Sequence, residues 1–87
     1  MKGLRWNPLK NEWLRITRGV SFNDLTDQGT LLGTRHHPTR TNQQIMLFEY
    51  QDWIWAVPFV MDHKERFLKT LYRSRKYTKL HRRGELI

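Results

Sequence analysis

Apolar residues dominate residues 53–60 and alternate with polar and basic residues along residues 67–73, with a charged segment between the two runs. In the first run, apolar side chains fall on both faces of an extended chain: Trp53, Trp55, Val57 and Phe59 on one, and Ile54, Ala56 and Val60 on the other. This pattern predicts a central strand that is covered on both sides. Pro58 has no N–H to donate, so we expect a bulge or one-sided pairing there. The second run predicts a strand whose outer face is basic.

A helix is predicted before these strands. Asn7 suits an N-cap, Pro8 suits the first helical position, and Gly19 suits a left-handed helix end. Apolar residues at i, i+4 and i+7 of this helix predict a stripe that faces the core: Leu9, Trp13 and Ile16.

A second short helix is predicted to begin after Ser21 and to end at Gly29. Asp24 stands in the place of the glutamate of a capping box. Phe22 and Leu25 are expected to face the core. The two helices together form an amphipathic pair that needs a sheet to lie on.

Two further strands are predicted at residues 31–36, interrupted at Gly33, and at residues 44–50, with a loop at residues 37–42 between them. Ser74 suits the N-cap of a C-terminal helix over about residues 75–82, whose small apolar face predicts partial docking or ordering on binding. We therefore expect an α+β fold, with two N-terminal helices packed on a four-stranded antiparallel sheet and a short basic C-terminal helix.

The composition restricts the class of protein. The chain has 87 residues, enough for one domain, and it contains no cysteine, which excludes disulfides and thiolate metal sites. No apolar run resembles a signal peptide or reaches the length of a membrane span. We expect a soluble cytoplasmic protein.

The net charge of +8 lies in one part of the chain. Residues 63–83 hold nine Lys and Arg against one acid, Glu65, whereas the other residues hold seven of each sign. Such a one-sided basic region indicates a polyanionic partner, either nucleic acid or an acidic protein. The alternative is a solvated basic face without a ligand.

Two segments resemble a known family. The run Trp6-Asn7-Pro8-x-Lys10, followed by Arg18-Gly19-Val20-Ser21-Phe22, resembles the opening segments W-(D/N)-P-x-K and K-H-G-V-S-F of BrnT-like toxins. The run Ser74-Arg75-Lys76-x-Thr78 resembles the S-A-R-R-A-T segment near the end of that family. These segments cover both ends of the chain in the family's order, and the centre matches only as strands.

The resemblance implies a RelE-like α+β fold and a single toxin-like domain over residues 1–87. It also implies the toxin of a type II toxin–antitoxin system, an endoribonuclease that needs no metal or other cofactor, cleaves RNA and inhibits translation. The partner would be a cognate antitoxin that covers the basic face. DNA would be bound only through the toxin–antitoxin complex, which represses its own promoter.

Three residues carry over from the family by position. Arg75 matches the motif arginine, and Glu12 and Lys10 match polar positions of the first helix. Arg18 stands where the family usually has histidine. Arginine stays protonated, so Arg18 cannot replace a histidine in acid–base work.

Cleavage of RNA by its 2′-OH requires a base, a group that stabilises charge on the phosphate, and an acid for the leaving 5′-oxygen. Arginine and lysine suit the phosphate through charge-assisted hydrogen bonds. The candidates near the last strand are Arg75, Lys69, Arg73 and Arg66. Further candidates for binding RNA are Lys64, Lys76, Lys79 and Arg18.

The acid–base groups are harder to assign. His63 and His81 are candidates because histidine titrates near neutral pH, and Glu12 is an alternative base. Two of these have a simpler interpretation: His63 as a solvated turn residue, and Glu12 as the partner of a basic residue on its helix.

The remaining candidates favour packing over chemistry. Tyr72 could stack on a base or pack, whereas Trp53 and Trp55 fit a core better than a base-stacking platform. The adjacent His36 and His37 would point to opposite faces of an extended segment, so a shared metal ion is not expected.

Two other classes of protein fit the same charge. One is a non-catalytic RNA- or DNA-binding module, ribosome-associated or regulatory, because it needs the same basic face. The other is an adaptor whose basic face docks an acidic protein only.

Overall fold

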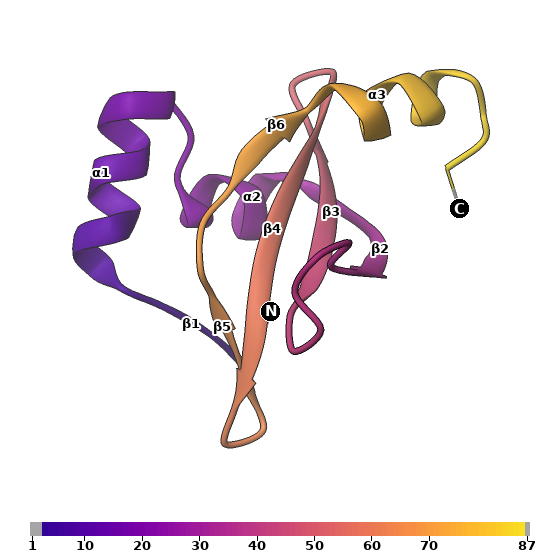
Figure 1. Ribbon diagram of the computed structural model, residues 1–87. Coiled ribbons are helices and arrows are strands. Elements are labelled where there is room, and N and C mark those ends of the chain that lie inside the picture. Colours follow the sequence, from indigo (N-terminus) through magenta and orange to yellow (C-terminus); the bar gives the residue numbers. More distant parts are fainter. Residues whose placement is uncertain (1–2, 87) are drawn as a thin grey trace.

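In a computed structural model that describes residues 3–86, the chain forms an α+β fold with three helices and one open, mixed sheet (Figure 1). The elements in chain order are β1 (Leu4–Trp6), α1 (Pro8–Arg18), α2 (Phe22–Gln28), β2 (Thr30–His36), β3 (Gln44–Tyr50), β4 (Trp53–Asp62), β5 (Glu65–Leu68), β6 (Tyr72–Ser74) and α3 (Arg75–Arg82). No helix within residues 3–86 is long and apolar enough to cross a bilayer.

The sheet differs from the predicted four-stranded antiparallel one. Its strand order is β1-β5-β4-β3-β2, and β6 pairs with the same edge of β4 as β5 does. β1, which the sequence analysis missed, pairs with β5 in parallel, and all other pairs are antiparallel. A strand of three residues has too short a pattern to stand out in a sequence, and its stability comes from its partner strand.

Pro58 explains why the predicted strand at residues 67–73 is divided into β5 and β6. On one side Pro58 pairs in register with Ile45 of β3. On the other side its carbonyl accepts a hydrogen bond of 2.8 Å from the Lys69 N–H, but it has no N–H to return. Between the last pair of β5 and the first pair of β6, the returning chain has residues 69–71 opposite only residues 57 and 58. Of the two expected outcomes at Pro58, the one-sided pairing is confirmed, whereas the extra residue lies in the returning chain between β5 and β6.

The predicted helix caps are confirmed. The Asn7 side chain accepts hydrogen bonds from the N–H groups of Leu9 and Lys10 at 2.8 and 3.3 Å, and Gly19 ends α1 with φ of 74°. Ser21 and Asp24 form a complete capping box at the start of α2.

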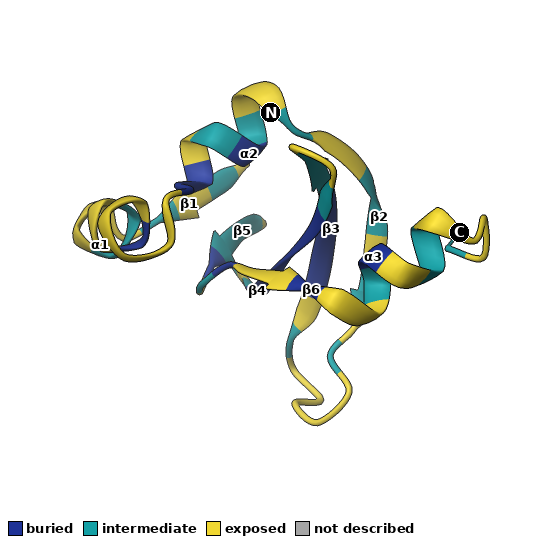
Figure 2. Cartoon of the chain, turned by 90° about the horizontal axis from the view of Figure 1, so that it is seen from above, coloured by how far each residue is buried: buried dark blue, intermediate teal, exposed yellow. Residues whose placement is uncertain are grey.

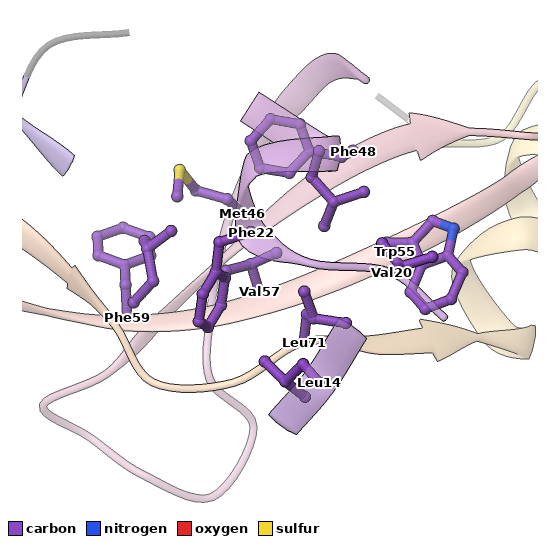
Figure 3. Packing of buried hydrophobic residues seen from close by; sticks show 11 residues of the cluster. Leu14, Val20, Phe22, Met46, Phe48, Trp55, Val57, Phe59 and Leu71 are labelled. Atoms are coloured by element: carbon purple, nitrogen blue, oxygen red, sulfur yellow. The ribbon is translucent and has the colours of Figure 1, made fainter. Parts of the chain in front are cut away.

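α2 lies on one face of the sheet, and α1 reaches the same buried cluster through Leu14. Phe22 and Leu25 of α2 are buried there as predicted, and the Phe22 ring packs against Trp6 of β1 with centroids 5.6 Å apart. Figure 3 shows side chains of the helices, such as Leu14 and Phe22, beside side chains of the strands, such as Val57. The members of the buried cluster on this face are Leu14, Val20, Phe22, Leu25, Met46, Phe48, Trp55, Val57, Phe59, Leu68 and Leu71.

The orientation predicted for α1 was wrong. Leu14 is the buried residue of this helix, whereas Leu9, Trp13 and Ile16 are 81%, 48% and 68% exposed. Figure 2 shows α1 as a largely exposed helix at the margin of the fold. Polar contacts attach it: the Asn11 amide accepts a hydrogen bond of 2.7 Å from the Phe22 N–H. Tertiary attachment through Leu14 and Asn11 therefore overrides the apolar periodicity.

The opposite face of the sheet holds a smaller buried cluster of Ile45, Leu47, Ile54 and Ala56. β4 thus has buried residues on both faces, as predicted. α3 begins after Ser74, which caps it as expected, and Tyr77 packs against this second cluster. The residue that α3 buries is Thr78.

Candidate nucleic-acid interface

Three hollows follow β6 from the loop between β2 and β3 to α3. The middle one has a volume of about 430 Å³ and is lined by Arg18, Trp55, Tyr72, Arg73 and Arg75. Tyr72 also lines the hollow beside the β2–β3 loop, and Arg75 also lines the hollow beside α3. Neighbouring hollows in this row share a lining residue, and we call the three together the β6 groove.

The lining of the β6 groove is strongly basic. Its cationic residues are Arg18, Arg40, Lys69, Arg73, Arg75, Lys79 and Arg82. No Asp or Glu is among the described residues that line the three hollows. Cations gathered in hollows that no carboxylate lines create a positive potential that attracts polyanions. Aromatic rings of Tyr72, Trp53 and Trp55 lie among these cations, a combination suited to phosphates and bases together.

Arg75 is the first residue of α3, and it lies between the middle hollow and the hollow beside α3. Ser74 fixes that start: its hydroxyl accepts a hydrogen bond of 3.1 Å from the Tyr77 N–H. The unpaired N–H groups of a helix start add positive potential on the side where Arg75 lies. Arg75, the arginine that matches the family motif in the sequence, thus lines two adjoining hollows.

Trp53 holds two guanidinium groups close together. Arg73 lies over its ring with 4.2 Å from guanidinium carbon to ring centroid, and Arg82 lies at 5.4 Å. Arg82 also donates a hydrogen bond of 3.1 Å to the Asp52 carbonyl. Cation–π contact positions the two charges without neutralising them. Trp53 therefore supports the basic surface and is half-buried, and Trp55 is buried in the core.

Arg18 connects α1 to the groove. Its guanidinium donates a hydrogen bond to the carbonyl oxygen of Leu71, just before β6, and lines the middle hollow. The chain thus places a permanent positive charge here, at the position where the resembling family usually has histidine.

Three predicted candidates lie away from the groove. His63 and Lys64 form the turn between β4 and β5, and Arg66 follows on β5, with its guanidinium 5.8 Å from the Phe59 ring. Ser74 pairs with Ile54 near the start of β4, whereas this turn follows the end of β4. About eight residues of strand separate the two places, roughly 25 Å. The structure does not bring His63 together with Arg75.

Glu12 is paired on the surface of α1. Its carboxylate accepts hydrogen bonds from the Arg15 Nε at 3.2 and 3.1 Å. This contact holds the pKa of the Glu12 carboxyl below its usual value, which makes it a weaker base. The sequence analysis also considered that Glu12 pairs with a basic residue of its own helix, and this pairing is confirmed.

The other basic candidates divide between the groove and its surroundings. Lys69 lines the hollow beside the β2–β3 loop, and Lys79 lines the hollow beside α3. Lys76 is not among the residues that line the three hollows; its ammonium lies 5.5 Å from the Tyr77 ring centroid. His81 contacts Glu49 at 3.0 Å and lines a fourth hollow, which also contains Glu49 and Asp52 and adjoins the hollow beside α3 through Thr78 and Arg82.

His37 is the histidine that lines the β6 groove within residues 3–86, and the sequence analysis considered it only as a metal ligand. Its Nδ1 accepts hydrogen bonds from the N–H groups of Thr39 and Arg40 at 3.2 and 3.1 Å. In the neutral ring this leaves the proton on Nε2, so the ring presents a donor. In the sequence, only the presence of Arg40 in the same loop points to a basic site near His37. The approach of this loop to Lys69 is a tertiary contact, which the sequence does not reveal.

Tyr72 lines two of the hollows and offers a phenol hydroxyl there. Burial raises the pKa of its phenol above the usual value, with a smaller contribution from Tyr77. The phenol therefore remains a hydrogen-bond donor throughout the neutral range. Among the described residues no group of three or more His, Cys, Asp or Glu side chains is placed to hold a metal ion.

Comparisons of the chain with protein-family models, with curated proteins and with solved structures give no match.

Proposed function

We propose that the chain is the toxin of a type II toxin–antitoxin pair, a BrnT-like and RelE-like endoribonuclease whose RNA substrate lies along the β6 groove. The observation that carries this proposal is the gathering of seven cations around Tyr72 and Trp53 in the three hollows of the β6 groove, whose described lining residues include no Asp or Glu. The family resemblance supplies the reaction, and the groove supplies a surface that fits the substrate.

In this proposal the arginines act on the phosphate. Arg75 and Arg73 contact the scissile phosphate and stabilise the charge that builds on its oxygens. Lys69, one hollow further along, holds a neighbouring phosphate. Tyr72, whose phenol stays protonated, stacks on a base or donates a hydrogen bond to the RNA.

Arg18 supports binding and charge stabilisation in place of the proton transfer that a histidine could perform. The reaction needs no metal or cofactor in this scheme. The protein would act in the cytoplasm, where an antitoxin would cover it, and would reach DNA only within the antitoxin complex.

A second candidate is an RNA-binding module without catalysis. It is favoured by the placement of the acid–base candidates: His63 lies at the far end of β4, and Glu12 is bound to Arg15. In its neutral form the His37 ring presents a donor to the groove, and not a base, because two N–H groups occupy its Nδ1.

The two candidates are separated by Arg75→Ala, with Lys64→Gln as a matched loss of charge outside the groove. Wild type and both variants would be expressed in a bacterial host while growth and total RNA are followed. Purified proteins would be tested for binding to a single-stranded RNA. A toxin predicts growth arrest and RNA breakage by wild type and Lys64→Gln, and loss of both effects in Arg75→Ala with most RNA affinity retained.

A binding module predicts intact RNA in every case and weaker binding by Arg75→Ala, comparable with that of any groove neighbour. If folded wild type neither affects growth nor binds RNA at physiological salt, both candidates are wrong.

A further inference from the structure

α1 presents three large apolar side chains to solvent. Leu9, Trp13 and Ile16 recur at i, i+4 and i+7, so they lie on one face of the helix, and all three are exposed. Scattered exposed apolar residues are ordinary, but a contiguous row on one helix face marks an interaction surface. We call these three residues the α1 stripe.

Two cationic side chains, of Lys10 and Arg18, lie beside the α1 stripe. The Lys10 ammonium lies 4.5 Å from the Trp13 ring centroid, and the Arg18 guanidinium lies 5.8 Å from it. The nearby acid, Glu12, is already neutralised by Arg15. An occupant of the stripe thus meets apolar side chains and two cations in one contact.

We propose that the α1 stripe is the docking surface for an acidic amphipathic helix of a partner protein. Apolar side chains of that segment at i, i+3 or i+4, and i+7 would pack on Leu9, Trp13 and Ile16. Its carboxylates would pair with Lys10 and Arg18, which satisfies the two cations as they lose water.

The same charges argue against a second copy of the chain as the occupant. In a symmetric pair of copies, Lys10 and Arg18 of one copy would approach the same two cations of the other, and like charges in a contact are unfavourable. At an anionic lipid surface Lys10 and Arg18 would meet headgroups, so vesicle binding is one of the outcomes that the experiment below tests. A carboxylate-bearing protein segment fits both features of the surface.

Docking at the α1 stripe would also affect the β6 groove, because Arg18 lies beside Trp13 of the stripe and also lines the groove. A carboxylate that pairs with Arg18 lowers the positive potential of the middle hollow. The partner would therefore weaken RNA binding. This consequence rests on the proposed function, whereas the docking itself does not.

The experiment uses two designed helical peptides with the same leucine pattern, one rich in glutamate and one rich in lysine. Binding to the full chain would be followed by backbone amide NMR shifts and calorimetry. We expect saturable binding of the acidic peptide, shifts centred on α1, and no comparable binding of the basic peptide.

Three variants localise the contact. Ile16→Ser should weaken acidic-peptide binding about tenfold without lowering the melting temperature, because Ile16 is exposed. Lys10→Glu should reduce the preference for the acidic peptide. Met61→Ser, an exposed apolar residue at the far end of β4, is the matched control and should leave binding unchanged.

The proposal is overturned if the acidic peptide does not bind below about 1 mM, or if Ile16→Ser and Met61→Ser bind it equally. It is also overturned if the stripe is occupied otherwise: if Ile16→Ser converts a dimer to a monomer in sedimentation, or abolishes binding to anionic vesicles that wild type binds more tightly than the peptide. A separate assay asks whether the peptide displaces RNA. Peptide binding without any RNA binding would reject the proposed function and leave the docking surface intact.

Discussion

The guanidinium of Arg18 donates a hydrogen bond to the carbonyl oxygen of Leu71, a residue 53 positions later in the chain. Leu71 lies between the end of β5 and the start of β6, and its side chain belongs to the same buried cluster as Leu14 of α1 (Figure 3). One polar contact and one apolar contact therefore attach the end of α1 to the strand edge that carries the basic residues.

Arg18→Met should remove the bond to the Leu71 carbonyl while keeping the apolar stem. We expect the free energy of unfolding to fall by about 1–2 kcal/mol, since a charged donor is removed from a partly buried carbonyl. Urea unfolding measures this. Lys10→Met on the same helix is the control and should change stability by less than about 0.5 kcal/mol. Equal effects of the two changes would mean that the Arg18 hydrogen bond adds no stability.

Leu14→Ala should be far more costly than Ile16→Ala. Leu14 is fully buried, so its truncation should lower the free energy of unfolding by about 2–5 kcal/mol. Ile16 is exposed, and its truncation should change stability by about 0.5 kcal/mol or less. Thermal and urea unfolding of the two variants compare them directly. The reverse order would show that α1 packs through the stripe instead.

Thr78→Val should loosen α3. The Thr78 hydroxyl accepts a hydrogen bond of 2.9 Å from the Ile54 N–H and donates one of 2.5 Å to the Ser74 carbonyl. Valine keeps the shape but leaves that N–H without a partner, at a cost of about 1–3 kcal/mol. Thr78→Ser keeps the hydroxyl and should cost less. Amide hydrogen exchange at Ile54 reports the difference, and equal exchange rates in both variants would contradict it.

Loss of charge in the β6 groove should weaken RNA binding in a salt-dependent way. For Arg73→Gln and Lys79→Gln, we expect lower affinity for single-stranded RNA and a salt slope reduced by about 1 for each phosphate that is no longer neutralised. Lys64→Gln lies in the distant turn and should keep the wild-type slope. Binding curves at several salt concentrations measure this. A fall in affinity for Lys64→Gln equal to that for Arg73→Gln would mean that only overall charge matters.

The Glu12 carboxyl should titrate below the usual range because Arg15 hydrogen-bonds to its ionised form. With its pKa lowered in the folded state, the pairing contributes stability above the unfolded pKa, and that contribution is lost as the pH falls through the folded pKa. NMR titration of the carboxyl carbon measures the shift. Arg15→Gln should raise the pKa back toward the usual value, and an unchanged pKa in that variant would assign the shift to another cause.

The sequence by itself determined the features that depend on near neighbours. Asn7, Ser21 and Ser74 cap helices because each side chain reaches an N–H two or three residues away. The two-sided apolar pattern of β4 and the irregularity at Pro58 follow from alternation and from a missing N–H. The basic C-terminal region is likewise a property of composition.

Only the tertiary structure decided how these elements meet. It placed the α1 stripe in solvent, paired β1 with β5, and separated His63 from Arg75 by most of β4. It also brought Arg18 and the β2–β3 loop beside β6, where their cations join one groove. Apolar periodicity specifies that a helix has a face to bury, but which side chain is buried depends on competition among contacts from distant parts of the chain. In α1 that competition favoured Leu14, and the exposed stripe is its consequence.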